Sequence, residues 1–276
     1  MEKYADYIRR IEIMSLWSGR NHIVWQLRPD VNILSGVNGV GKSTILNKII
    51  SQLRHRSDKI KNGSVPGVQL EFAPDDATGV RFDIIRSFDN GLIPGSLLAK
   101  IGDENIRSEL DWKLYELQRR YLDYQVNVGN RMIELLTSGS PDAQEQAMKA
   151  SQAKTRFQDL IDELFQETRK KINRSSNELQ FLQYGEKLPP YALSSGEKQM
   201  LVILLTVLLQ DGKNYVLFMD EPEVSLHIEW QERLINIVRS LNSNAQIILT
   251  THSPAVVMNG WTDAVTEVTD ITLQDG

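Results

Sequence analysis

The sequence predicts an α/β protein with a mixed or parallel core sheet, an antiparallel β-layer and an inserted helical hairpin. Three observations support this prediction. An apolar strand at 31–34 runs through a glycine-rich loop into a helix over 42–53. Apolar strands at 215–219 and 246–249 alternate with helical patterns, which is typical of a buried parallel sheet. From Glu104 onward, apolar residues recur every three or four positions, as in a long amphipathic helix.

Length and composition are those of a folded protein. The 276 residues, 41% hydrophobic and 24% charged, form one large domain or two modest ones. The absence of cysteine excludes disulfides, thiolate zinc sites and a cysteine nucleophile. The first ten residues contain Glu2 and Asp6 and no apolar segment, and the longest apolar run, 200–209, has about half the ~20 residues of a membrane-spanning helix. We therefore expect a cytoplasmic protein without membrane insertion.

Antiparallel strands are predicted on both sides of the glycine-rich loop. Apolar and polar residues alternate in 68–72 and 80–88, and the segments 11–16 and 22–27 resemble them. Such alternation is typical of strands with one buried and one exposed face. We expect these four segments to form the antiparallel layer.

The helical pattern from Glu104 is interrupted by a Ser, Gly and Pro cluster at 138–142. Ser140 is predicted as an N-cap and Pro141 as the first residue of a second helix. Apolar positions on this second arm continue to Ile172. The hairpin is interpreted either as a packed helical lobe or as a short antiparallel coiled coil.

Residues 36–43, GVNGVGKS, match the phosphate-loop pattern GxxxxGK[ST] between a strand and a helix. Glycines let backbone N–H groups surround phosphate oxygens, Lys42 is expected to neutralise the β- and γ-phosphates, and the Ser43 hydroxyl is expected to bind Mg²⁺. The motif therefore predicts a site for ATP and Mg²⁺. Its expected nucleotide-binding residues are Gly36, Asn38, Gly39, Gly41, Lys42, Ser43 and Thr44.

The apolar strand 215–219 ends in two carboxylates, Asp220 and Glu221. In an open parallel sheet this strand end lies beside the phosphate loop. Asp220 is expected to hold the magnesium together with Ser43, and Glu221 to orient or deprotonate the attacking water. An acidic pair alone would indicate a solvated strand end, whereas its combination with a phosphate loop indicates ATP hydrolysis.

Three further segments support a resemblance to a known class. LSSGEKQ at 193–199 has the spacing of a helix capping box and also resembles the ABC signature. DEPEVSLH at 220–227 and TTHSP at 250–254 resemble Walker B, D-loop and switch-histidine segments. Their order is similar to that in ABC-type P-loop ATPases of the SMC, RecF and OLD-like class, which includes short stand-alone AAA-type ATP-binding proteins. The resemblance implies a P-loop NTPase head of the ABC type.

In that class two protomers sandwich two ATP molecules, and the signature of one protomer closes on the γ-phosphate held by the other. The resemblance therefore implies that Ser194, Ser195 and Gly196 contact nucleotide in trans. It also implies that His252 senses the γ-phosphate and acts with Glu221 and Lys42 in catalysis, and that His227 lies in the D-loop.

Two elements of the class are not clear. Gln69 is the only glutamine in 53–102 that a Q-loop can use, and Trp17 or Arg20 before the phosphate loop is the candidate for adenine stacking. Each of these three residues has an ordinary structural interpretation as well.

The expected organisation is an ATPase head made of residues 1–102 and 184–276, with the helical hairpin inserted at 103–183. Residues 1–60 carry a net charge of +5 and residues 184–276 one of −7, so the basic phosphate-binding part and the acidic part are separate. This is not the uniformly basic composition of a DNA-binding surface, although nucleic acid stays among the candidate partners.

The expected function is that of an ATP-hydrolysing switch, a homodimer around ATP that drives a separate effector such as a nuclease or toxin. DNA repair and anti-phage defence are the expected settings. The alternative is a nucleotide-binding subunit of an ABC transporter, and a third interpretation is a scaffold that nucleotide binding assembles, with slow or no turnover.

Overall fold

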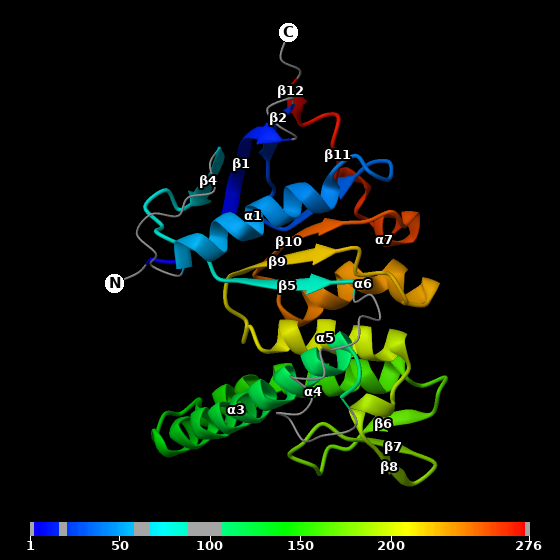
Figure 1. The fold of residues 1–276 in the computed structure, drawn as a ribbon. Coiled ribbons are helices and arrows are strands. Elements are labelled where there is room, and N and C mark those ends of the chain that lie inside the picture. The colour runs from blue at the N-terminus through cyan, green and yellow to red at the C-terminus, as the bar shows by residue number, and fades with distance from the viewer. Residues whose placement is uncertain (1–2, 17–20, 58–66, 88–105, 274–276) are drawn as a thin grey trace. The chain divides into compact units, whose positions relative to one another are not determined.

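The computed structural model covers residues 1–276 and describes residues 3–16, 21–57, 67–87 and 106–273 (Figure 1). The chain forms two compact units. The first consists of Met1–Ser87, Gly212–Arg239 and Ser243–Gly276, and the second of Phe88–Asp211 and Ser240–Asn242.

A parallel five-stranded sheet is the centre of the first unit. Its strand order is β11-β3-β10-β9-β5, and every neighbouring pair is parallel. Residues of β9 and β10 are almost all apolar and buried, as expected for central strands covered on both faces. The strands are β3 (Val31–Ser35), β5 (Phe82–Arg86), β9 (Tyr215–Asp220), β10 (Ala245–Thr250) and β11 (Val265–Glu267).

The second sheet of this unit is antiparallel, with strand order β12-β2-β1-β4. Helix α1 (Lys42–Ser57) lies between the two sheets (Figure 1). Its apolar residues, the ones predicted from the sequence pattern, pack into one core with residues of both sheets. The antiparallel strands are β1 (Tyr7–Leu16), β2 (Asn21–Gln26), β4 (Val68–Ala73) and β12 (Thr272–Leu273), and the remaining helices are α6 (Ile228–Leu241), α7 (Pro254–Met258) and η2 (Thr262–Ala264).

The prediction that 80–88 belongs to the antiparallel layer is wrong. Strand β5 pairs in parallel with β9, from Phe82 opposite Val216 to Arg86 opposite Asp220. It is an edge strand in which Ile85 is the fully buried residue. A half-exposed edge strand has the same alternation whether its neighbour runs parallel or antiparallel, so the pattern does not reveal the pairing.

Three helices form most of the second unit: α3 (Glu109–Thr137), α4 (Ala143–Leu164) and α5 (Ser195–Leu208). Ser108 is the N-cap of helix α3, and its side chain forms a capping box with Asp111. Helices α3 and α4 pack against each other, and both contact α5. These contacts favour the interpretation as a packed helical lobe.

Two boundary predictions for the second arm are wrong. The N-cap of α4 is Asp142 rather than Ser140, and the helix ends at Leu164. Ile172 lies instead in a three-stranded antiparallel sheet that the sequence analysis did not predict. Its strands have three residues each, which is too short for a periodic signal. They are β6 (Lys170–Ile172), β7 (Phe181–Gln183) and β8 (Glu186–Leu188), and η1 (Pro190–Ala192) follows them.

Helix α5 is the apolar segment noted in the sequence. It has 14 residues, which corresponds to about 21 Å at 1.5 Å per residue. Among the helices of the described residues, none combines the length and apolar character that crossing a membrane requires.

Candidate nucleotide-binding site

The glycine-rich loop joins the end of β3 to the first residue of α1. Gly36, Gly39 and Gly41 have φ values of 149°, 80° and 101°, a region that residues with a side chain rarely adopt. A Cβ on Gly36 would lie 2.8 Å from Cγ1 of Val40. The backbone N–H of Ile45 donates to the Gly41 carbonyl at 2.9 Å, so helical hydrogen bonding starts directly after the loop. The loop conformation therefore depends on its glycines.

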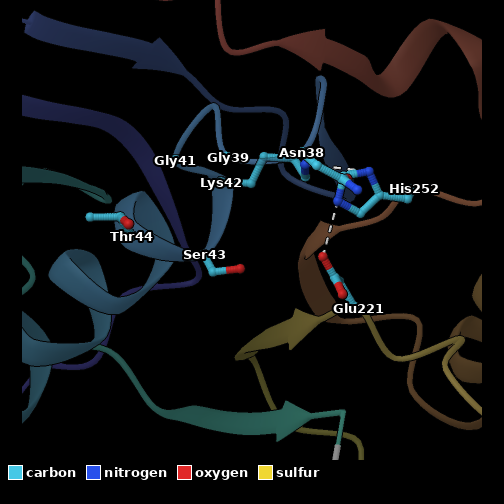
Figure 2. Close-up of a pocket in the computed structure, with 8 residues that line it drawn as sticks. All are labelled: Asn38, Gly39, Gly41, Lys42, Ser43, Thr44, Glu221 and His252. Carbon is cyan, nitrogen blue, oxygen red and sulfur yellow. Dashed lines mark hydrogen bonds and ion pairs between the residues drawn. The ribbon is translucent and has the colours of Figure 1, made fainter.

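A pocket of about 340 Å³ lies at this helix N-terminus (Figure 2). It brings the phosphate loop together with Glu221, which directly follows β9, and His252, which follows β10. Such an N-terminus, with its free N–H groups, favours anions. The lining residues are Asn38, Gly39, Gly41, Lys42, Ser43, Thr44, Glu221 and His252.

Lys42 is nearly buried, with 4% of its surface exposed. Its ammonium group donates to the carbonyl oxygens of Gly36 at 2.9 Å and Val37 at 3.3 Å, and lies 3.5 Å from Nδ1 of His252. Burial lowers the pKa of Lys42, and the nearby carboxylates of Glu221, Asp220 and Glu223 oppose this effect only in part. The lysine is thus held at the loop in a position where it can meet a phosphate.

Asp220, the last residue of β9, accepts two hydroxyl hydrogen bonds on Oδ1. One comes from Oγ of Ser43 at 2.9 Å, and the other from Oγ1 of Thr250 at 2.6 Å. Thr250 is the direct neighbour of Asp220 in the parallel pairing of β9 and β10. A hydroxyl and a carboxylate are hard oxygen ligands of the kind that Mg²⁺ prefers. Ser43 and Asp220 therefore fit the predicted metal position.

Glu221 and His252 meet at the pocket wall (Figure 2), where Nε2 of His252 lies 3.1 Å from Oε1 of Glu221. The backbone N–H of Glu221 donates to the carbonyl and to the hydroxyl of Thr250, at 3.1 and 3.2 Å. The φ of Glu221 is 47°, an uncommon conformation for a residue with a side chain. About a third of each of the two side chains, 32% for Glu221 and 35% for His252, is exposed. A water molecule can therefore reach both groups.

Two site residues were missed by the sequence analysis. Thr250 contacts Asp220 and Glu221, and Glu223 accepts hydrogen bonds from Thr251 and from the backbone N–H of His252. Both lie inside segments that the sequence analysis recognised, Glu223 in the D-loop segment and Thr250 in the switch-histidine segment, but neither was given a role at the site. His227, in contrast, is exposed and does not line the pocket; its carbonyl accepts from the N–H groups at the start of α6.

The signature segment belongs to the second unit, where Ser194 is the N-cap of α5. A capping box links Ser194 and Glu197, as the sequence spacing predicted. The Glu197 carboxylate also accepts from Oγ1 of Thr168 at 2.7 Å and from the ammonium group of Lys170 at 2.8 and 2.9 Å. Lys198 donates to Oδ1 of Asp111 in α3 at 2.7 Å. The segment carrying Ser194, Ser195 and Gly196 is thus anchored to two neighbouring elements.

The Glu197 cluster predicts a pH-dependent stability. Burial alone would raise the pKa of Glu197, but hydrogen bonds from Lys170, Ser194 and Thr168 outweigh burial and lower the pKa below 4.5. A lowered carboxyl pKa stabilises the fold above the unfolded-state value, and this contribution is lost as the pH falls through the folded-state value. Glu197→Gln is expected to cost about 1–3 kcal/mol at pH 7. Urea unfolding of both proteins between pH 7 and pH 3 tests this. An unfolding free-energy difference that stays constant as the pH falls would contradict it.

The remaining sequence candidates lie elsewhere. Gln69 is in β4, paired with Glu12 of the antiparallel sheet, and does not line the pocket. Trp17 and Arg20 lie outside the described residues. Among these three candidates, the structure therefore places none at the pocket as a Q-loop glutamine or as an adenine contact.

One solved structure of an SMC head has the same fold, and two further SMC heads are less similar. The SMC head bound to the C-winged helix domain of ScpA has a TM-score of 0.53 at 13% identity, over 97% of this chain and 98% of that chain. An SMC head with an extended coiled coil, bound to the C-terminal domain of ScpA and derived from Pyrococcus furiosus, has a TM-score of 0.48 at 14% identity over 97% and 96% of the two chains. The SMC head from Thermotoga maritima has a TM-score of 0.48 at 15% identity over 98% and 99%.

The fold and the phosphate loop together define the class of P-loop NTPase folds that includes the SMC head. Within that class the chain belongs to the family described as "AAA domain, putative AbiEii toxin, Type IV TA system", whose model matches residues 51–259. The matched stretch begins inside α1, after the phosphate loop, and contains the signature segment, Asp220, Glu221 and His252.

Proposed function

We propose that this protein binds ATP with Mg²⁺ and hydrolyses it to ADP and phosphate. The single observation that best supports this proposal is the position of Glu221 and His252, which face the phosphate loop across one pocket. A carboxylate beside a phosphate site is the group that orients a water molecule or accepts its proton.

The loop N–H groups and the ammonium group of Lys42 bind the phosphates and neutralise their charge. Mg²⁺ would be held by Ser43 and Asp220 and would supply further charge neutralisation on the phosphates. Glu221 accepts a proton from the water molecule while the water oxygen forms a bond to the γ-phosphorus. The bond between the γ-phosphorus and the β–γ bridging oxygen breaks, and ADP leaves with that oxygen. His252, within hydrogen-bond distance of Glu221, donates to a γ-phosphate oxygen. The nucleotide ligands are Gly36, Asn38, Gly39, Gly41, Lys42, Ser43 and Thr44.

The oligomeric part of the proposal is a homodimer that closes around ATP. Ser194, Ser195 and Gly196 of one protomer complete the site of the other. Their place at the N-terminus of a well-capped helix supports this role, because such a terminus favours phosphate. We keep the division into a head of 1–102 and 184–276 with an inserted hairpin at 103–183 as part of this proposal.

We propose that the ATP-dependent closing and opening of this dimer acts on a separate effector, a nuclease or toxin. The proposed setting is DNA repair or anti-phage defence in the cytoplasm. The SMC head of similar fold is bound to a domain of another protein, ScpA, which supports a partner protein for this chain as well. The family to which the chain belongs is described by a putative AbiEii toxin and a type IV TA system, and this description supports a role in defence.

Phosphate release from ATP with Mg²⁺ tests the enzymatic proposal. We expect wild-type turnover and a loss of about 100-fold or more in kcat/KM for Lys42→Ala, because a cation at the phosphates is removed from a preorganised site. Lys149→Ala is the matched control, since this lysine is exposed on α4 and pairs with Glu145 on the same helix. A wild-type protein that binds fluorescent ATP but releases no phosphate would contradict hydrolysis.

A further inference from the structure

Glu223 lies between the two segments that position the catalytic pair. It comes two residues after Glu221, and 6% of its surface is exposed. Its Oε1 accepts from Oγ1 of Thr251 and, at 3.1 Å, from the backbone N–H of His252. One carboxylate oxygen thus joins the turn after β9 to the turn after β10.

Stability by itself does not explain this arrangement of Glu223. The second oxygen, Oε2, is buried and has no hydrogen-bond partner among the described residues, and an unpaired buried acceptor destabilises a fold. The unpaired Oε2 and the two hydrogen bonds on Oε1 together point to a contribution of Glu223 at the site.

A second connection joins the same two segments. Gln231 of α6 donates through Nε2 to the carbonyl of Leu226 at 2.9 Å, and its Oε1 accepts from Oγ of Ser253 at 2.6 Å. Ser253 in turn donates its backbone N–H to Oγ1 of Thr251 at 2.9 Å. The φ of Ser225, between the two connections, is 77°, so this turn has an uncommon conformation that its surroundings maintain.

We propose that Glu223 is a positioning residue that holds His252 at Glu221 and Lys42, and that Gln231 supports it from α6. Through these two side chains, residues 223–227 and residues 251–253 move together. A partner that displaces 223–227 therefore displaces His252. The inference rests on the proposed function only in so far as His252 takes part in turnover.

Kinetics test the catalytic consequence. Glu223→Ala removes the acceptor of Thr251 and His252, and we expect kcat to fall about tenfold while KM changes by less than about twofold, because the phosphate loop is untouched. Glu223→Gln keeps one oxygen that can accept both bonds and is expected to restore most of kcat. Glu229→Ala, which removes an exposed carboxylate on α6, is the matched control.

A second readout does not depend on turnover. The chain has four histidines, so the ¹³Cε1 resonance of His252 is assigned by comparison with His252→Gln. Glu223→Ala is expected to shift this resonance, whereas Glu229→Ala leaves it in place. Thr251→Val keeps the side-chain shape at a buried position but removes the hydroxyl that donates to Glu223, so we expect a smaller shift of the same resonance. This variant provides the test if Glu223→Ala does not fold.

The outcomes separate the two proposals. An unshifted His252 resonance in a folded Glu223→Ala protein, or in Thr251→Val if only that variant folds, overturns the positioning role. A Glu223→Gln protein as slow as Glu223→Ala also overturns it, because the hydrogen bonds would then be irrelevant. If wild-type protein shows no turnover, the ATPase proposal fails, while the resonance still tests how Glu223 positions His252.

Discussion

Glu221→Gln is expected to abolish turnover and to accumulate a dimer that depends on ATP. The amide can still accept a hydrogen bond from Nε2 of His252, so the 3.1 Å contact and the pocket shape persist. It cannot accept a proton from water, and loss of a general base lowers kcat by about 10²–10⁴-fold. Phosphate binding by the loop and Lys42 is retained. ATP that is bound and not hydrolysed then holds two protomers together.

Light scattering after size-exclusion chromatography measures this result. The protomer mass is 31.5 kDa, and the variant is expected to double its mass with ATP and Mg²⁺ but not with ADP. Glu232→Gln, an exposed carboxylate on α6, is the control, and adding Lys42→Ala to Glu221→Gln is expected to return the monomer. A monomeric Glu221→Gln protein that has bound ATP would contradict the ATP sandwich.

Ser194→Arg is expected to retain ATP binding and to lose turnover. The phosphate loop and the Asp220–Glu221 strand end are not changed, so a single protomer still binds nucleotide. A long cation at the start of α5 blocks the approach of the signature to a γ-phosphate held by a second protomer. The substitution also removes the N-cap of α5, which costs about 1 kcal/mol. Ser108→Arg removes the equivalent capping box of α3 and controls for that loss.

Mixing two inactive variants tests whether the signature acts in trans. A heterodimer of Ser194→Arg and Lys42→Ala has one composite site in which the phosphate loop and the signature are both intact. Random pairing at equal amounts is expected to recover about a quarter of the wild-type rate, since half of the dimers are mixed and each has one of two sites. Recovery of no activity, or full activity of Ser194→Arg alone, would refute the trans arrangement.

The phosphate loop was predictable because it is local. Its eight consecutive residues lie between a strand and a helix that both have clear apolar patterns, and the helix face predicted over 42–53 is the one buried in the core. Asp220 and Glu221 were predictable for the same reason, since a carboxylate pair directly after an apolar strand marks the strand end. The capping box of Ser194 and Glu197 is likewise a local pattern.

The pairing of β5 was not predictable, because strand alternation reports exposure and not the direction of the neighbour. The short strands of 170–188 gave no periodic signal. The roles of Thr250 and Glu223 were missed because they depend on which strands are adjacent. Thr250 meets Asp220 only through the register of β10 against β9.

By itself, the amino-acid sequence determined the class of the protein, the phosphate loop, and the carboxylate and histidine candidates, since short-range patterns encode all of these. Only the tertiary structure decided that Glu221 and His252 touch, that Lys42 is buried beside them, and that Glu223 joins their two segments. The physical reason is that these contacts cross between parallel strands. The order of strands in such a sheet follows from the packing of the whole unit and not from any stretch of neighbouring residues.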